Sequence, residues 1–238
     1  MVLHRNSSFF RQKAAWAALV LIAFLNPSWA AYTVTDAVGN QVRFEQPPQR
    51  IITLLPSLAE TVCALGACQR IVGRDRYTIW PPELVQRVPA VGGGLDPQIE
   101  AVVALKPDVV LVSSSSRVSE RLRSLGLRVV VLEPKTLDQV RDVLRIVGQV
   151  LGLPPEQAER VWQKMDASIS QTAAQIPAAL HGKRLYFEVS RGPYAAGATS
   201  YLGELMSRLG LGNIIDKSMG PFPKLNPEFI VLKNPDFI

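Results

Sequence analysis

The sequence is poor in the residues that hold metals and perform acid–base chemistry. Its 238 residues include two histidines and two cysteines, too few to assemble a closed metal site of four such ligands readily. Neither a Gly-x-Ser-x-Gly nor a His-Glu-x-x-His motif occurs, and these are the patterns of serine hydrolases and zinc proteases. We therefore expect no metal site, no cofactor and no enzymatic activity.

An excess of charge of one sign is also lacking. The formal net charge is +6. Residues 1–30 carry three of the 26 basic residues and no acidic ones, so without them the charge is +3. The basic residues are scattered along the chain, whereas a nucleic-acid-binding surface needs them clustered. We expect no nucleic-acid partner.

The N-terminus has the pattern of an export signal. Three basic residues precede the apolar run 14–25, which at about a dozen residues is too short to span a bilayer. Ser28 and Ala30 place small residues at the −3 and −1 positions of a cleavage site. We predict a signal peptide over residues 1–30, and the alternative is an uncleaved membrane anchor.

The two cysteines, Cys63 and Cys68, lie five residues apart on either side of Gly66, where a helix is expected to stop. Export places the chain in an oxidising compartment, which permits a disulfide. Such a bridge would join a helix end to its loop. Two buried thiols are the alternative.

Strand and helix patterns alternate from Arg50 onward, after a predicted β-hairpin at residues 33–44. Ser57 and Glu60 have the spacing of a capping box, and Asp96-Pro97 that of a cap followed by an N1 proline. This alternation predicts a parallel sheet covered by helices on both faces. The expected strands are 51–55, 71–73, 108–112 and 129–132, and the expected helices are 57–66, 97–105, 119–125 and 137–151.

A long helical pattern follows, from Glu156 to about Ile176, with no strand inside it. We interpret it as a rigid connector, and an ordinary packing helix within one domain is the alternative. Strand and helix patterns then resume, with strands expected at 184–189 and 214–215, a helix at 201–209 and another that opens at Asn226-Pro227.

The two halves of the chain contain the same short sequence pattern. Asp96-Pro97 leads to Lys106-Pro107-Asp108, and Asn226-Pro227 leads to Asn234-Pro235-Asp236. A repeat at this distance indicates two similar lobes. The predicted fold is α/β, with two Rossmann-like lobes of parallel sheet joined by one long rigid helix. The first copy continues past its Pro-Asp strand and the second does not, so we expect a second lobe that is C-terminally truncated.

The predicted organisation is an N-terminal lobe at 31–152, a connector helix at 153–180 and an incomplete C-terminal lobe at 181–238. Several stretches resemble periplasmic substrate-binding proteins of the cobalamin, haem and ferric-siderophore ABC importers, whose two lobes are joined by one long helix. The likeness is greatest to the cobalamin (vitamin B12) binders. The matching stretches are 50–57 with Glu60, 71–73, 80–82, 104–110, 194–197, 203–205 and 212–214.

The resemblance implies a ligand held between the lobes by the loops that follow the strands, in agreement with the general rule for parallel sheets. Tyr77 matches a tyrosine that contacts the corrin ring in that family. Trp80 and Tyr194 either contact the ligand with their flat aromatic faces or pack their own loops against the lobe. Gly92-Gly93-Gly94 either lets the backbone approach the ligand closely or forms a flexible turn. The candidate ligand-binding residues are Pro56, Ser57, Tyr77, Trp80, Gly93 and Tyr194.

The resemblance also implies one surface carboxylate per lobe that docks on the permease. The candidates are Glu120 and Glu204, and a solvated glutamate on a helix is the alternative for each. The expected function is capture of cobalamin or a related corrinoid in the periplasm by a monomer, and its delivery to the permease dimer and ATPase of an ABC importer. Haem or a ferric siderophore is the alternative ligand, and a secreted sensor or binding module without transport is an alternative of another class.

Overall fold

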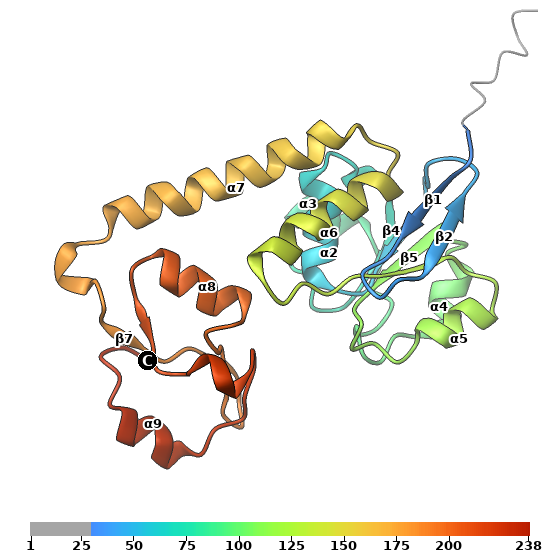
Figure 1. Ribbon diagram of the computed structural model, residues 1–238. Helices are drawn as coiled ribbons and strands as arrows, with labels where there is room; N and C mark the ends of the chain where they lie inside the picture. The colour runs from blue at the N-terminus through green and yellow to red at the C-terminus, as the bar shows by residue number, and fades with distance from the viewer. Residues whose placement is uncertain (1–29) are drawn as a thin grey trace, which may run out of the picture.

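The computed structural model describes residues 30–238, so the predicted signal peptide lies outside the described residues apart from Ala30. Figure 1 shows two lobes of unequal size with the helix α7, Pro155–Gln175, running between them. Among the described residues, no helix has the length and apolar character needed to cross a membrane.

A four-stranded parallel sheet forms the centre of the first lobe, in the order β4-β3-β5-β6. Residues alternate between its two faces, as side chains of a strand must. In β5, for example, Val109 and Leu111 enter one apolar core, and Val110 and Val112 enter the other. The strands are β3 (Ile51–Thr53), β4 (Ile71–Arg74), β5 (Val109–Val112) and β6 (Val129–Val131).

Helices cover both faces of this sheet (Figure 1). Helix α2 (Pro56–Ala64) and helix α6 (Leu137–Val150) supply buried residues to one core, together with the start of α7. Helices α4 (Ile99–Ala104) and α5 (Ser119–Ser124) cover the other face. The predicted doubly covered parallel sheet is confirmed.

The predicted hairpin is present as β1 (Tyr32–Thr35) and β2 (Gln41–Phe44). Its turn attaches to the outer strand β6, because Ala37 N donates to Val131 O at 3.0 Å and Val131 N donates to the Asp36 carboxylate at 3.1 Å. Asp36 is buried and also accepts from Asn40 N at 2.8 Å. The hairpin thereby occupies backbone groups that an edge strand would otherwise leave unpaired.

Two local predictions in the first lobe are wrong, and one helix was missed. Helix α2 begins at Pro56 with Leu55 as its N-cap, so Ser57 lies inside the helix and forms no capping box. Helix α4 begins at Ile99 and not at Pro97, because Pro97 bridges to Gly92 instead. Helix α3, Pro82–Arg87, was not predicted.

Cys63 and Cys68 form a disulfide that joins the end of α2 to a short 3-10 turn, Cys68–Arg70. This turn leads directly into β4. Both cysteines pack against the first core. The bridge therefore lies at the amino end of β4, away from the loops that follow the strands.

The second lobe is smaller and has shorter strands. The predicted strand 184–189 is divided, and the strand predicted at 214–215 lies two residues earlier, at β10. Pairing is parallel between β7 and β10 and antiparallel between β8 and β9. Helices α8 (Tyr201–Arg208) and α9 (Pro227–Lys233) agree with the predictions. The strands are β7 (Arg184–Leu185), β8 (Glu188–Ser190), β9 (Tyr194–Ala195) and β10 (Gly212–Asn213).

The predicted repeat has the same hydrogen bonds in both lobes. Asp108 accepts from Arg50 N at 2.8 Å, and the Arg50 guanidinium donates to Leu105 O at 2.6 Å. Asp236 accepts from Arg184 N at 2.7 Å, and the Arg184 guanidinium donates to Lys233 O at 3.0 Å. In each lobe the arginine thus connects the start of a strand to the end of the helix that precedes the Pro-Asp pair.

Candidate functional site

The loop after β4 presents large apolar side chains to solvent. Tyr77, Ile79 and Trp80 are 65%, 81% and 61% exposed. Exposed apolar side chains gathered in one place are characteristic of binding surfaces. We call residues 75–81 the aromatic loop.

Pro56 and Ser57 lie beside this loop in the topology of the sheet. They follow β3, which pairs with β4, and Ser57 is exposed. The carboxyl ends of neighbouring parallel strands share one edge of a sheet, which is where ligands of such folds bind. The structure therefore brings Pro56, Ser57, Tyr77 and Trp80 to the same edge, as predicted.

Gly93 does not belong to this exposed group. It is buried, and a Cβ atom there would lie 2.2 Å from the Asp96 carboxylate. A Cβ at Gly94 would lie 2.4 Å from Leu54 O, and Gly92 has a φ of +97°. Gly92 and Gly94 thus let the segment approach the protein's own backbone closely, and Gly93 as a ligand-binding residue stays a prediction.

The second lobe contributes its own exposed apolar group around the β8–β9 hairpin. Tyr194 is 41% exposed, and Phe187 and Val189 are exposed to a similar degree. Phe222 is also exposed and meets the ring of Tyr201 edge-on, with 6.2 Å between the centroids. Each lobe thus offers aromatic surface, and Tyr194 is where the prediction placed it, on the lobe opposite Tyr77.

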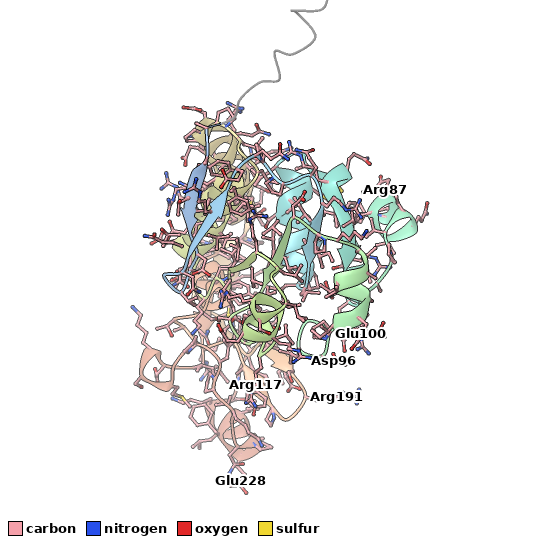
Figure 2. All side chains as sticks on the ribbon, turned by 90° about the vertical axis from the view of Figure 1, so that its right-hand side faces the viewer. Arg87, Asp96, Glu100, Arg117, Arg191 and Glu228 are labelled. Carbon is pink, nitrogen blue, oxygen red and sulfur yellow. A yellow bond between two sulfur atoms is a disulfide. The ribbon has the colours of Figure 1, made fainter. Side chains whose placement is uncertain are left out.

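Arginines accompany the aromatic surface. Arg76 pairs with Asp96 at 2.6 Å and lies 5.8 Å from the centre of the Tyr77 ring. Arg191 belongs to the β8–β9 turn of the second lobe, whereas Asp96 and Arg117 belong to the first lobe (Figure 2). An arginine is the side chain best suited to a carboxylate or phosphate group on a ligand.

The lobes touch each other at a second place besides α7. Glu204 in α8 accepts a hydrogen bond from Leu137 N, the first residue of α6, at 2.7 Å. Tyr201 N donates to Lys135 O at 2.6 Å. Arg208 in α8 also pairs with Asp166 of α7 at 2.7 Å. Helix α8 therefore binds both the first lobe and the connector.

The two candidate docking carboxylates have different surroundings. The Glu120 side chain is 85% exposed and forms an i,i+3 pair with Arg123. Glu204 is partly buried in the contact between the lobes. This contact was not predicted, because a glutamate that caps a helix in another lobe leaves no local pattern in the sequence.

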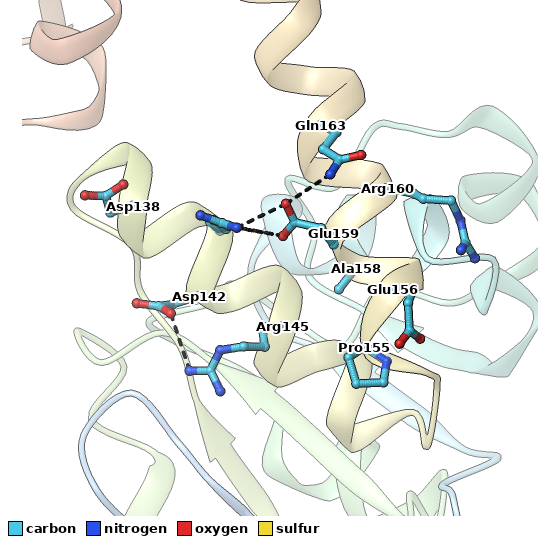
Figure 3. A pocket seen from close by; sticks show the side chains of 10 residues that line it. Asp138, Asp142, Arg145, Pro155, Glu156, Ala158, Glu159, Arg160 and Gln163 are labelled. Carbon is cyan, nitrogen blue, oxygen red and sulfur yellow. Dashed lines mark hydrogen bonds and ion pairs between the residues drawn. The ribbon is translucent and has the colours of Figure 1, made fainter.

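A groove of about 680 Å³ lies between α6 and the N-terminal half of α7 (Figure 3). Charged side chains surround it, and the Arg141 guanidinium donates three hydrogen bonds to the Glu159 carboxylate, at 2.9, 3.0 and 3.2 Å. It lies between two helices and away from the exposed aromatic groups, so we do not assign the ligand to it.

Residues 30–238 contain no group of three or more His, Cys, Asp and Glu side chains placed to hold a metal ion. The candidate site itself presents aromatic faces, apolar side chains and an arginine. Aromatic faces with a few polar groups are typical of sites for small molecules.

Comparison with known proteins agrees with this arrangement of two lobes and a connector. Residues 51–238 match the model of the periplasmic binding protein family. The chain belongs to the periplasmic binding protein family. Relatives of this periplasmic binding protein are described as periplasmic or lipoprotein substrate-binding proteins.

Two relatives are named for cobalamin, which is vitamin B12. The "cobalamin-binding protein" of Halobacterium salinarum is 30% identical over 214 residues, which are 87% of this chain and 57% of the relative. The "vitamin B12-binding protein" of Salmonella typhimurium is 29% identical over 193 residues, which are 79% of this chain and 71% of the relative. The chain thus spans little more than half the length of the first of these relatives.

A solved structure with this fold is named for haem. The periplasmic heme-binding protein of Pseudomonas aeruginosa superposes with a TM-score of 0.68 at 25% identity, and the match covers 79% of this chain and 70% of that chain. The predicted two-lobe α/β fold is confirmed.

Proposed function

We propose that this periplasmic binding protein is the substrate-binding component of an ABC importer and that it captures cobalamin or a related corrinoid between its lobes. The observation that carries the proposal is the exposure of Tyr77 and Trp80 at the carboxyl edge of the sheet, with Tyr194 exposed on the other lobe. The names of the Halobacterium and Salmonella relatives favour a corrinoid.

The mechanism is binding without chemistry. Aromatic faces contact the ring system, and the exposed arginines near Tyr77 and Tyr194 in the chain, Arg76 and Arg191, are available to a phosphate group of the ligand. Because α8 and α7 both tie the lobes together, the site needs little reorganisation when the ligand arrives. A site formed in advance spends less of its interaction free energy on ordering the protein.

Export and delivery belong to the same proposal. A signal peptide over residues 1–30 directs the chain to the periplasm, and a permease with its ATPase receives the ligand. Glu120 is the docking carboxylate of the first lobe, because its side chain is 85% exposed. Glu204 is the less suitable candidate, because Leu137 N already occupies one of its oxygens.

The test is a calorimetric titration of the purified protein with cyanocobalamin. We expect saturable binding, and we expect Tyr77→Ala to weaken it about tenfold, since stacking of one aromatic side chain contributes on the order of 1 kcal/mol beyond its area. Leu125→Ala is the matched control, because Leu125 is an exposed apolar residue at the C-cap of α5 and lies outside the aromatic loop. Equal losses in both variants would contradict the assignment of Tyr77.

Haem is the second candidate, favoured by the name of the Pseudomonas structure and by the exposed phenol of Tyr77, a residue type that can be an axial ligand of haem iron. The same titration with hemin distinguishes the two. A Soret shift with hemin and no heat with cyanocobalamin would replace the corrinoid by haem. Saturable binding of a ligand without stimulation of a permease and its ATPase would favour a sensor.

A further inference from the structure

A buried carboxylate lies beneath the aromatic loop. Asp75 is 0% exposed, and its side chain accepts hydrogen bonds from Tyr77 N at 2.8 Å and from the Thr78 hydroxyl. Thr78 is itself buried. Among residues 30–238 Asp75 forms no ion pair. A carboxylate without an opposite charge is costly to bury unless hydrogen bonds compensate it, so both contacts are important to it.

The neighbouring guanidinium holds the same loop from its other side. Arg74 donates to Asp75 O and Thr78 O, each at 3.1 Å, and to Val88 O at 3.1 Å. A fourth contact reaches Val85 O in α3 at 3.4 Å. One side chain therefore joins the start and the middle of the aromatic loop to α3 and to the segment that follows α3. Four of the five N–H groups of Arg74 are therefore directed at backbone carbonyls of the protein itself.

Further backbone contacts fix where the loop starts. Asp75 N donates to Thr53 O at 2.9 Å and Arg76 N donates to Gly92 O at 2.7 Å. Tyr77, Ile79 and Trp80 are nevertheless more than half exposed. The buried contacts of this loop are thus polar, whereas its apolar side chains face solvent. This is the reverse of what apolar burial alone would select.

We infer that Asp75 is a positioning residue, which acts with Thr78 and Arg74 to hold the aromatic loop in the conformation that presents Tyr77 and Trp80 to the ligand. The inference rests on the proposed function for the identity of the ligand. Without these contacts the aromatic side chains would bury themselves against the lobe, and the ligand would have to displace them. If only a fraction of the molecules has the loop in its binding conformation, the apparent affinity for the ligand falls in proportion to that fraction.

Thr78→Val tests this inference, because it removes the hydroxyl donor and keeps the shape of the side chain. Thr78→Ser keeps the donor. Thr172→Val is the matched control, since the Thr172 hydroxyl donates to Ser168 O at 2.9 Å within α7, far along the chain from the loop. Thermal unfolding of each variant checks that it is folded.

The first measurement is amide hydrogen exchange without ligand. We expect Thr78→Val to accelerate exchange in residues 75–81 and to leave the strands β3 and β5 unchanged, with Thr78→Ser close to the parent protein. The second is cyanocobalamin binding, where we expect a loss of about tenfold for Thr78→Val, equivalent to about 1.4 kcal/mol, and recovery in Thr78→Ser.

The two readouts separate this inference from the proposed function. Unchanged exchange in residues 75–81 of Thr78→Val overturns the inference, as does faster exchange with full cyanocobalamin affinity. If the parent protein binds neither cyanocobalamin nor hemin, the proposed function fails, and the exchange measurement still decides whether Asp75 holds the loop. Should Thr78→Val not fold, Arg74→Lys replaces it, because a lysine cannot reach four carbonyls with a planar fork.

Discussion

Burial raises the pKa of Tyr186 to about 12, and the hydrogen bond to Glu188 and the negative charge of that carboxylate add to the effect. The phenol donates to Glu188 Oε2 at 3.0 Å. Tyr186 belongs to the core of the second lobe. A phenolate there would be both desolvated and next to a like charge, so the folded state keeps its proton.

This arrangement predicts a pH dependence. The unfolded chain releases the tyrosine proton near pH 10 and the folded chain near pH 12, so the stabilisation is complete below about pH 10 and is lost as pH rises toward 12. Glu188→Gln should lower the pKa of Tyr186 while leaving it above 10, because burial remains. An absorbance titration of the phenolates measures this. Glu228→Gln, at the start of α9, should leave the titration unaltered.

Thr53 offers a second prediction at this scale. It is fully buried at the end of β3, and its hydroxyl has no hydrogen-bond partner among the described residues. Removing an unpaired buried polar atom without changing its shape is neutral or stabilising. We expect Thr53→Val to keep or raise the free energy of unfolding, by up to about 1 kcal/mol, in urea denaturation. A loss of more than that would show that the hydroxyl is satisfied.

Single residues also mark the limit of prediction from sequence. The exposed aromatic residues Tyr77 and Trp80 stand out in a polar loop, and the family pattern draws attention to Tyr77. Asp75 and Arg74 do not stand out, because a carboxylate and a guanidinium in a loop are usually solvated. Arg74 donates to backbone carbonyls between Asp75 and Val88, and Asp75 accepts from Tyr77 N and the Thr78 hydroxyl. Only the folded loop brings these partners together.

At the scale of elements, prediction succeeded where a pattern had enough length. Helices α6 and α7 were predicted within two residues of their observed ends, because their apolar spacing repeats over several turns. The two-residue strands β7, β9 and β10 have no such repeat. The Pro-Asp repeat was informative because each aspartate accepts a backbone N–H from the neighbouring strand.

Glu204 provides the element-scale prediction. Its carboxylate accepts from the first backbone N–H of α6, where a negative charge also favours the helix dipole. We expect Glu204→Ala to lower the free energy of unfolding by about 1 kcal/mol, the usual effect of losing such a cap, and to speed hydrogen exchange in the first turn of α6. Glu60→Ala, an exposed glutamate on α2, is the control in the same urea titration. Equal values for the two variants would show that the contact between the lobes contributes nothing.

At the scale of the whole molecule, the lobes are placed relative to each other by two connections. One is α7, 21 residues long. The other is α8, which contacts the first lobe through Tyr201 and Glu204 and contacts α7 through Arg208. The long connector was predicted from its helical spacing. The second connection could not be, because it joins residues about 65 positions apart in the chain without a shared pattern.

Ala167→Pro separates the contributions of these two connections. Ala167 is an exposed residue in the middle of α7, and a proline there removes a helical hydrogen bond and clashes with the preceding turn, at a cost of about 3 kcal/mol. If α7 sets the placement of the lobes, small-angle scattering should show a larger and more variable molecule, and cyanocobalamin affinity should fall at least tenfold. Ala167→Gly, which costs about 1 kcal/mol without a clash, should leave the scattering profile unchanged. An unaltered profile and affinity in Ala167→Pro would instead mean that α8 holds the lobes without a rigid connector. In that case, combining the proline with Glu204→Ala should release them.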